Sequence, residues 1–179
     1  MLPKRVLETD TMALFGKRKI TANKLFSDAD ELLLPTRQSI EKNWWPIVEI
    51  EERAVEFKSQ VVTELLLLRL FAIDLAIFSA FQGEVQDAMR DQIHIHASEN
   101  IPDILDDIPL RQQAYGEAWA NHSLSHLPNS YSVVKKFIEI CELPESVTIQ
   151  MGVTELFSTI LTSTKKFFDK IQKSYQIIP

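Results

Sequence analysis

The stretch VVTELLLLRLFAIDLAIFSAF, residues Val61–Phe81, decides the fold. It is long enough to cross a bilayer, and thirteen of its residues are Leu, Ile, Phe or Val. On the insertion scale these thirteen contribute about −4 to −8 kcal/mol, whereas Glu64, Arg69 and Asp74 together cost roughly 5 to 10 kcal/mol. Insertion is therefore close to neutral or unfavourable, and we predict that this segment does not span a membrane.

The same segment is predicted to be a helix in the protein core. At 100° per residue, Glu64, Arg69 and Asp74 follow one another at about 140° around a helix, so no face is uniformly polar. A helix that is apolar nearly all round is packed by neighbours on several sides. Because a buried charge without a partner costs several kcal/mol, we expect all three charges to find partners on neighbouring helices.

The apolar spacing continues upstream of this segment as far as Ile47, and Pro46 suits a first helical position. An unbroken helix over residues 46–82 would be about 55 Å long. A break within residues 57–60 is the alternative, and Gly83 favours a break at the other end.

The rest of the chain also has the character of helices. No alternation of period two persists, and QIHIHAS (residues 92–98) is too short to indicate a strand. We therefore predict an all-α fold, a compact bundle of five or six helices around a long central apolar helix. Residues 1–20 are expected to form a basic N-terminal arm, and residues 21–179 a single helical domain. The further helices are expected over residues 23–34, 84–98, 109–127 and 131–143, with the last one after Ser146.

Charge is distributed unevenly along the chain, whose net charge is −6. Residues 84–117 hold eight acids against two arginines, whereas residues 1–24 hold six bases against two acids. The two regions can bind each other, or the arm can bind an anionic partner. Four lysines near the end of the last helix suit the helix dipole, or a membrane surface. Cys141 is the only cysteine, which excludes an internal disulfide and favours the cytoplasm.

One helical face carries the residues best suited to binding a ligand. Tyr115, Trp119, His122 and His126 fall within about 60° of one another on a helical wheel. Such a stripe lines either the core or a pocket. Two histidines four residues apart can share one metal ion, so a divalent metal on His122 and His126 is the chemistry that this face supports.

An antiparallel hairpin of residues 84–98 and 109–127 would place His122 opposite Glu84. Glu84 or Asp87 would then supply a third metal ligand. The same hairpin separates His96 from His122 by about 18 Å, so the histidines do not form one cluster, and His96 is expected to be partly buried with a hydrogen-bond partner. A di-iron site is disfavoured, because it needs two carboxylate–histidine motifs and the chain has one, Asp91 with His94.

Other chemistries lack their motifs. The zinc-protease pattern needs Glu where Ser123 stands, and Ser123 and Ser125 form no arrangement with a base and its orienting group. Four scattered glycines cannot form a phosphate loop. The basic residues are too few in an acidic chain to indicate a nucleic-acid partner.

The leading hypothesis is therefore a soluble helical protein without catalytic activity that binds itself or another protein. One alternative is a bundle that binds a metal or a small ligand through His122 and His126. A second alternative is peripheral membrane contact through the arm or the last helix. No cofactor is predicted beyond the divalent metal of the first alternative.

Overall fold

The structure is a computed structural model that describes residues 17–29, 33, 35–121 and 128–179. Within these residues the fold is all-α, as predicted, with two four-residue strands as its only β-structure. The described part contains nine α-helices rather than five or six. The difference arises in one region, where three short helices follow one another: α2 (Arg37–Asn43), α3 (Trp45–Val48) and α4 (Glu52–Glu56).

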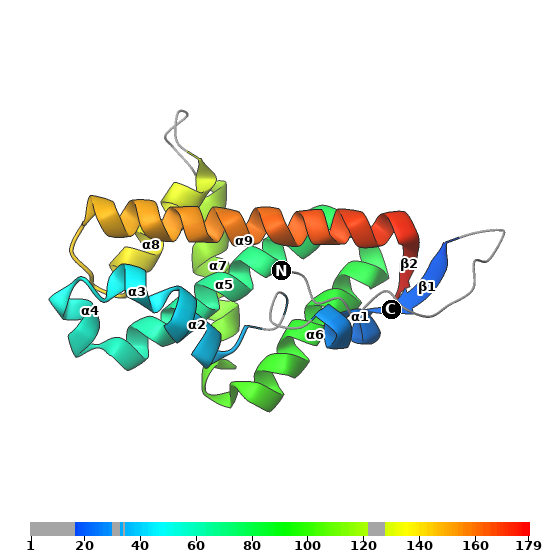
Figure 1. Ribbon diagram of the computed structural model, residues 1–179, viewed down its shortest axis with the longest axis horizontal. Helices are drawn as coiled ribbons and strands as arrows, with labels where there is room; N and C mark the ends of the chain where they lie inside the picture. The colour runs from blue at the N-terminus through cyan, green and yellow to red at the C-terminus, as the bar shows by residue number, and fades with distance from the viewer. Residues whose placement is uncertain (1–16, 30–32, 34, 122–127) are drawn as a thin grey trace.

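Helix α5 (Lys58–Ala80) lies at the centre of the molecule (Figure 1). Fifteen of its residues are buried, including Glu64, Arg69 and Asp74, and helices pack against it from several sides. No helix in the described part of the chain is long and apolar enough to cross a membrane. The prediction of a central core helix is confirmed.

Of the two alternatives for residues 46–82, the unbroken helix is wrong and the break near residues 57–60 is confirmed. The chain leaves helical geometry at residues 49–51 and again at Phe57, where φ is −110° and ψ is 33°. These breaks let α3 turn and pack against α9 (Val147–Ser174). At this contact the side chain of Ile47 takes the space beside Gly152, where a Cβ would lie only 2.6 Å from Ile47 Cγ2.

Helix α9 is the longest element, with 28 residues and a length of about 42 Å. Its apolar stripe, which includes Val153, Phe157 and Phe168, is buried and packs chiefly against α5. Core packing of this stripe is confirmed. The remaining helices are α1 (Ala22–Ala29), α6 (Gly83–Asn100), the 3-10 helix η2 (Pro102–Ile104), α7 (Asp107–Ala120) and α8 (Asn129–Ile140).

Helices α6 and α7 do not form the expected hairpin. Helix α6 packs against α1 and α5, whereas α7 packs against α8 and α5. Each is tied to α5 by its own ion pair, Arg90 to Asp74 and Arg111 to Glu64. Because Glu64 and Asp74 are ten residues apart on α5, these attachments are about 15 Å apart along its axis.

Two parallel strands join the described ends of the chain, β1 (Arg18–Thr21) and β2 (Tyr175–Ile178). Ile20 pairs with Ile177, and both pack against the core. Residues 18–20 of the expected arm therefore take part in this strand pair, whereas residues 1–16 lie outside the described residues. Neither sequence, RKIT or YQII, has the strict alternation of apolar and polar residues that marks a strand.

Candidate functional site

The buried charges of α5 are each held by a neighbouring helix. Glu64 accepts hydrogen bonds from Arg111 Nε, at 2.9 and 2.8 Å to its two oxygens, and from the Tyr115 hydroxyl. Asp74 accepts hydrogen bonds from Arg90 at 2.6 and 3.3 Å. The prediction that these charges find partners is confirmed.

The third charge of α5 has a different kind of partner. Arg69 Nη1 donates to the hydroxyl of Ser39 on α2 at 3.2 Å, and both residues are buried. Three separate helices, α2, α6 and α7, are thus oriented against α5 by polar contacts. Each of the three charges joins α5 to a different helix of the bundle.

The groups around Glu64 are held in their protonated forms. Burial raises the pKa of Tyr115 well above its ordinary value, and the charge of Glu64 raises it further. Burial, with the charge of Glu64, also raises the pKa of the Cys141 thiol far above its ordinary range. At neutral pH Tyr115 is a neutral donor and Cys141 a neutral thiol, which is a poor nucleophile. The cluster supports packing and provides no activated nucleophile.

Of the four residues on the expected ligand-binding face, the structure describes two, Tyr115 and Trp119. Tyr115 is fully buried and directs its hydroxyl to Glu64. Trp119 is partly buried and packs against Phe157, with 6.3 Å between ring centroids. His122 and His126 lie outside the described residues.

The carboxylates proposed as third metal ligands lie in another part of the molecule. Glu84 and Asp87 are exposed at the start of α6. The adjoining residue Phe81 packs against Phe168 of α9, eleven residues beyond Phe157, or about 16 Å along that helix. Among the described residues, no three His, Cys, Asp or Glu side chains are grouped to hold a metal. The metal site on His122 and His126 stays a prediction.

His96 lies where its sequence pattern places it. It is partly buried, and its Nε2 is 3.3 Å from the carbonyl oxygen of Pro35. The prediction of a partly buried histidine with a hydrogen-bond partner is confirmed.

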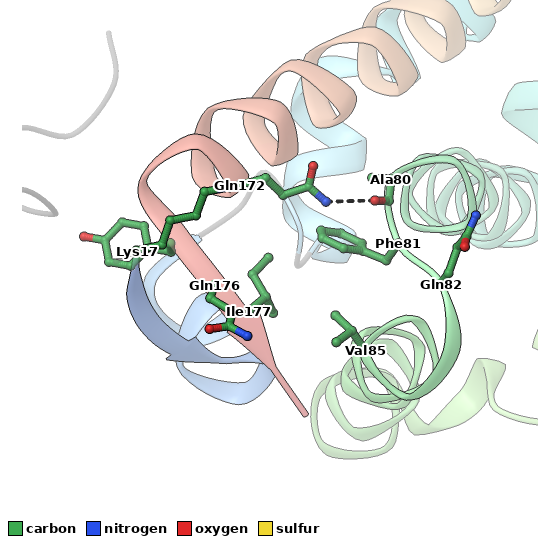
Figure 2. A pocket seen from close by; sticks show the side chains of 9 residues that line it. Lys17, Ala80, Phe81, Gln82, Val85, Gln172, Gln176 and Ile177 are labelled. Atoms are coloured by element: carbon green, nitrogen blue, oxygen red, sulfur yellow. Dashed lines mark hydrogen bonds between the residues drawn. The ribbon is translucent and has the colours of Figure 1, made fainter. Parts of the chain in front are cut away.

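A pocket of about 580 Å³ opens where α5 turns into α6 (Figure 2). Gly83 has φ of +59°, a conformation that favours glycine, and this allows the sharp turn. Phe81, Val85 and Ile177 give the pocket an apolar wall, and Gln172 Nε2 donates to the Ala80 carbonyl at its upper side. The polar lining residues are Lys17, Gln82, Gln172, Tyr175 and Gln176.

Exposed lysines gather around this corner of the molecule. We define the basic end as Lys17, Lys19, Lys166, Lys170 and Lys173, all of which are exposed. Lys166, Lys170 and Lys173 follow spacings of four and three residues and share one face of α9. None of the five makes an ion pair with another described residue, although Asp169 lies among them in sequence.

Sequence reasoning identified both groups of bases but not that they meet. The N-terminal bases and the C-terminal lysines are joined by the pairing of β1 with β2. The two strands are about 150 residues apart, and no local pattern predicts such a pairing. A comparison with protein families, curated proteins and solved structures finds no match to this chain. The basic end is therefore the candidate functional site on the strength of its own geometry.

Proposed function

We propose that the protein is a non-catalytic binding protein that docks an acidic surface of another protein chain through its basic end. The observation that carries this proposal is that five exposed lysines without an ion pair in the described structure stand on β1, beside it and on the last turns of α9, elements that the pairing of β1 with β2 brings to one end of the molecule. In an acidic chain, cations that had only to keep the protein in solution would not need to be gathered at one corner. Their grouping favours an anionic partner.

The expected strength of this contact follows from surface electrostatics. An exposed ion pair contributes about 0.2–1 kcal/mol, so five lysines support moderate affinity at most. They also steer an acidic partner towards this end of the molecule and accelerate association. Both effects weaken with added salt, because the Debye length falls to about 8 Å at physiological ionic strength.

The platform under these lysines supports a binding role. Lys166, Lys170 and Lys173 stand on a helix whose opposite face is buried against α5. Lys19 stands on β1, which is hydrogen-bonded to β2. Little backbone ordering is needed when a partner binds, and this lowers the entropic cost of association.

The test uses a fluorescent polyglutamate peptide as the probe and fluorescence anisotropy as the readout. The basic-end variant carries Lys166→Glu, Lys170→Glu and Lys173→Glu. We expect the wild-type protein to bind the peptide at low salt and to lose affinity steeply as salt rises. The basic-end variant should bind at least tenfold more weakly, which is about 1.4 kcal/mol.

A matched control variant separates local from overall charge. It carries Lys42→Glu, Lys58→Glu and Lys135→Glu, three exposed lysines on other elements, and has the same net charge as the basic-end variant. We expect it to bind like the wild type. Equal losses in the two variants, or tighter binding of a single-stranded oligonucleotide of matched charge, would contradict the proposal.

A second candidate function is peripheral contact with an anionic membrane. The same convergence of lysines favours it, since a basic residue near an anionic leaflet contributes about 1 kcal/mol. Sedimentation with vesicles of phosphatidylcholine and phosphatidylserine tests it at low salt. Sedimentation of the wild type with these vesicles, but not with pure phosphatidylcholine, supports it. Both candidates fit a cytoplasmic location, which stays a prediction from the single cysteine.

A further inference from the structure

The end of the molecule opposite the basic end has a complementary surface. We define the acidic end as Glu49, Ile50 and Glu51, between α3 and α4, and Glu52, the first residue of α4, together with Val147 and Met151 at the start of α9. Ile50, Val147 and Met151 are 58%, 68% and 68% exposed. The packing of Ile47 beside Gly152 brings the two segments together, and Figure 1 shows α3 beside the first turns of α9.

The acidic end keeps its negative charge in the described structure. Arg53 is the basic residue of α4, and it pairs with Glu56 and Glu142 at 3.5 and 2.9 Å. Glu49, Glu51 and Glu52 make no ion pair with any described residue. The apolar side chains are therefore bordered by three carboxylates that the fold does not neutralise.

The length of α9 keeps the two ends of one molecule apart. Met151 and Lys170 are nineteen residues apart on this helix, or about 29 Å along its axis. This separation exceeds the Debye length of about 10 Å at 0.1 M salt. Glutamates and lysines that cannot meet within one copy can still meet between two copies.

We propose that the basic end of one copy binds the acidic end of a second copy, so that the molecules associate head to tail. This inference rests on the proposed function, because it names the partner of the basic end. Charge complementarity carries it, with three carboxylates on one surface and, on the other, five lysines that outnumber the exposed Asp169, Glu84 and Asp87 at that corner. Apolar contacts are available on both sides, since Phe78 near the basic end is 67% exposed and Phe81, Val85 and Ile177 line the adjacent pocket.

The geometry also determines the form of the assembly. Two different surfaces meet, so a bound pair of copies leaves one basic and one acidic end open. Association therefore continues to longer chains, or closes into a ring where the rotation between copies permits. A distribution of masses that shifts with concentration is expected, instead of one fixed dimer.

Sedimentation velocity at several protein concentrations tests the inference, at about 0.01 M and about 1 M salt, where the Debye length is about 30 Å and 3 Å. We expect the wild type to form species larger than a monomer at low salt and to be monomeric at high salt. The basic-end variant should be monomeric at both. An acidic-end variant, with Glu49→Lys, Glu51→Lys and Glu52→Lys, should also be monomeric at both.

Mixing the two variants provides the decisive measurement. Each variant carries like charges at both ends, so neither associates with itself, but each is complementary to the other. We expect the equimolar mixture to recover association at low salt to at least half of the wild-type weight-average mass increase. The matched control variant should associate like the wild type, and circular dichroism should show that all variants are folded.

Several outcomes would overturn head-to-tail association. These are a wild type that is monomeric at low salt across all concentrations, a mixture of folded variants that does not associate, or a control variant that loses association as fully as the basic-end variant. Self-association can be absent while the wild type binds the polyglutamate peptide and the basic-end variant binds it more weakly. The proposed function then stands, with a different protein chain as the partner. If the peptide is not bound either, both proposals fail.

Discussion

The charged residues of α5 and those of the basic end differ in burial and in ion pairing. Glu64 and Asp74 are buried, and each faces an arginine from a neighbouring helix. The lysines of the basic end are exposed and have no ion pair within the described part of the molecule. Inside the bundle each of these carboxylates is paired with an arginine, whereas at the basic end several lysines stand on one exposed surface without an ion pair.

The difference shows what each set of charges does. A buried ion pair specifies how helices meet, because a shifted helix would leave a charge without its partner. Lysines three and four residues apart on an exposed face repel one another by a few tenths of a kcal/mol. This small repulsion is present at the basic end, as expected for a surface that binds an anionic group of another molecule.

The largest expected effect comes from breaking the Glu64–Arg111 pair. Replacing Arg111→Met leaves the Glu64 carboxylate buried without its cation and should reduce the free energy of unfolding by about 3–5 kcal/mol. Urea denaturation followed by circular dichroism measures this. The double variant Glu64→Leu, Arg111→Met should recover most of the loss, since it removes both charges. A single variant as stable as the wild type would show that the pair does not specify packing.

Alkaline pH gives the next largest effect, again on buried groups. The folded state holds the Cys141 thiol protonated, while the unfolded thiol ionises near pH 9.0. Above that pH the unfolded state binds fewer protons than the folded state, so the free energy of unfolding should fall by about 1.4 kcal/mol per pH unit for this group. Tyr115 should add a similar fall above about pH 10. Denaturation between pH 8 and 11 measures the slope, which should be shallower in a Cys141→Ala variant. Identical slopes would contradict burial of this thiol.

A smaller effect is expected at the second ion pair, which is less buried. The side chains of Asp74 and Arg90 are 13% and 40% exposed, against 4% and 29% for Glu64 and Arg111. Water can therefore solvate Asp74 in part, and Arg90→Met should cost about 1–2 kcal/mol. The same denaturation experiment ranks the two arginine variants by their loss of unfolding free energy. A larger loss for Arg90→Met than for Arg111→Met would contradict the expectation that the more buried pair contributes more.

The smallest effect on stability is expected at the basic end. Replacing Lys166, Lys170 and Lys173 together by Ala should change the free energy of unfolding by less than about 0.5 kcal/mol per site, and relief of repulsion favours a slight gain. The same variant should lose affinity for the polyglutamate peptide. A large loss of stability would assign these lysines a structural role.

Much of the bundle could be predicted from sequence because burial leaves local patterns. The apolar residues and charges of Val61–Phe81 indicated a core helix with partnered charges, and the stripe of the last helix indicated core packing. The identities of Arg111, Arg90 and Ser39 as partners depend on how distant helices pack. The assumed hairpin of α6 and α7 failed for the same reason, since α7 packs against α8 and α5, and no local pattern predicts that contact.

The candidate site was harder to predict, because its two halves are remote in sequence. The bases of residues 17–19 and of α9 were visible separately, but only β1 and β2 bring them together. Those strands lack a sequence signal of their own, whereas QIHIHAS, the one apparent strand, is part of α6. Tyr115 and Trp119 share a helical face, as the helical wheel indicated, and both rings pack on aromatic residues of α5 and α9, whereas His122 and His126 lie outside the described residues.

The pairing of β1 with β2 has a consequence for synthesis of the chain. Strand β1 leaves the ribosome about 150 residues before its partner, which is roughly 8–30 s at 5–20 residues per second. Throughout this time Ile20 lacks the strand that covers it, and the basic residues beside it stand apart from the lysines of α9. The basic end is therefore completed only after β2 has emerged, so a nascent chain held short of Tyr175 lacks the strand pair that joins its two groups of lysines.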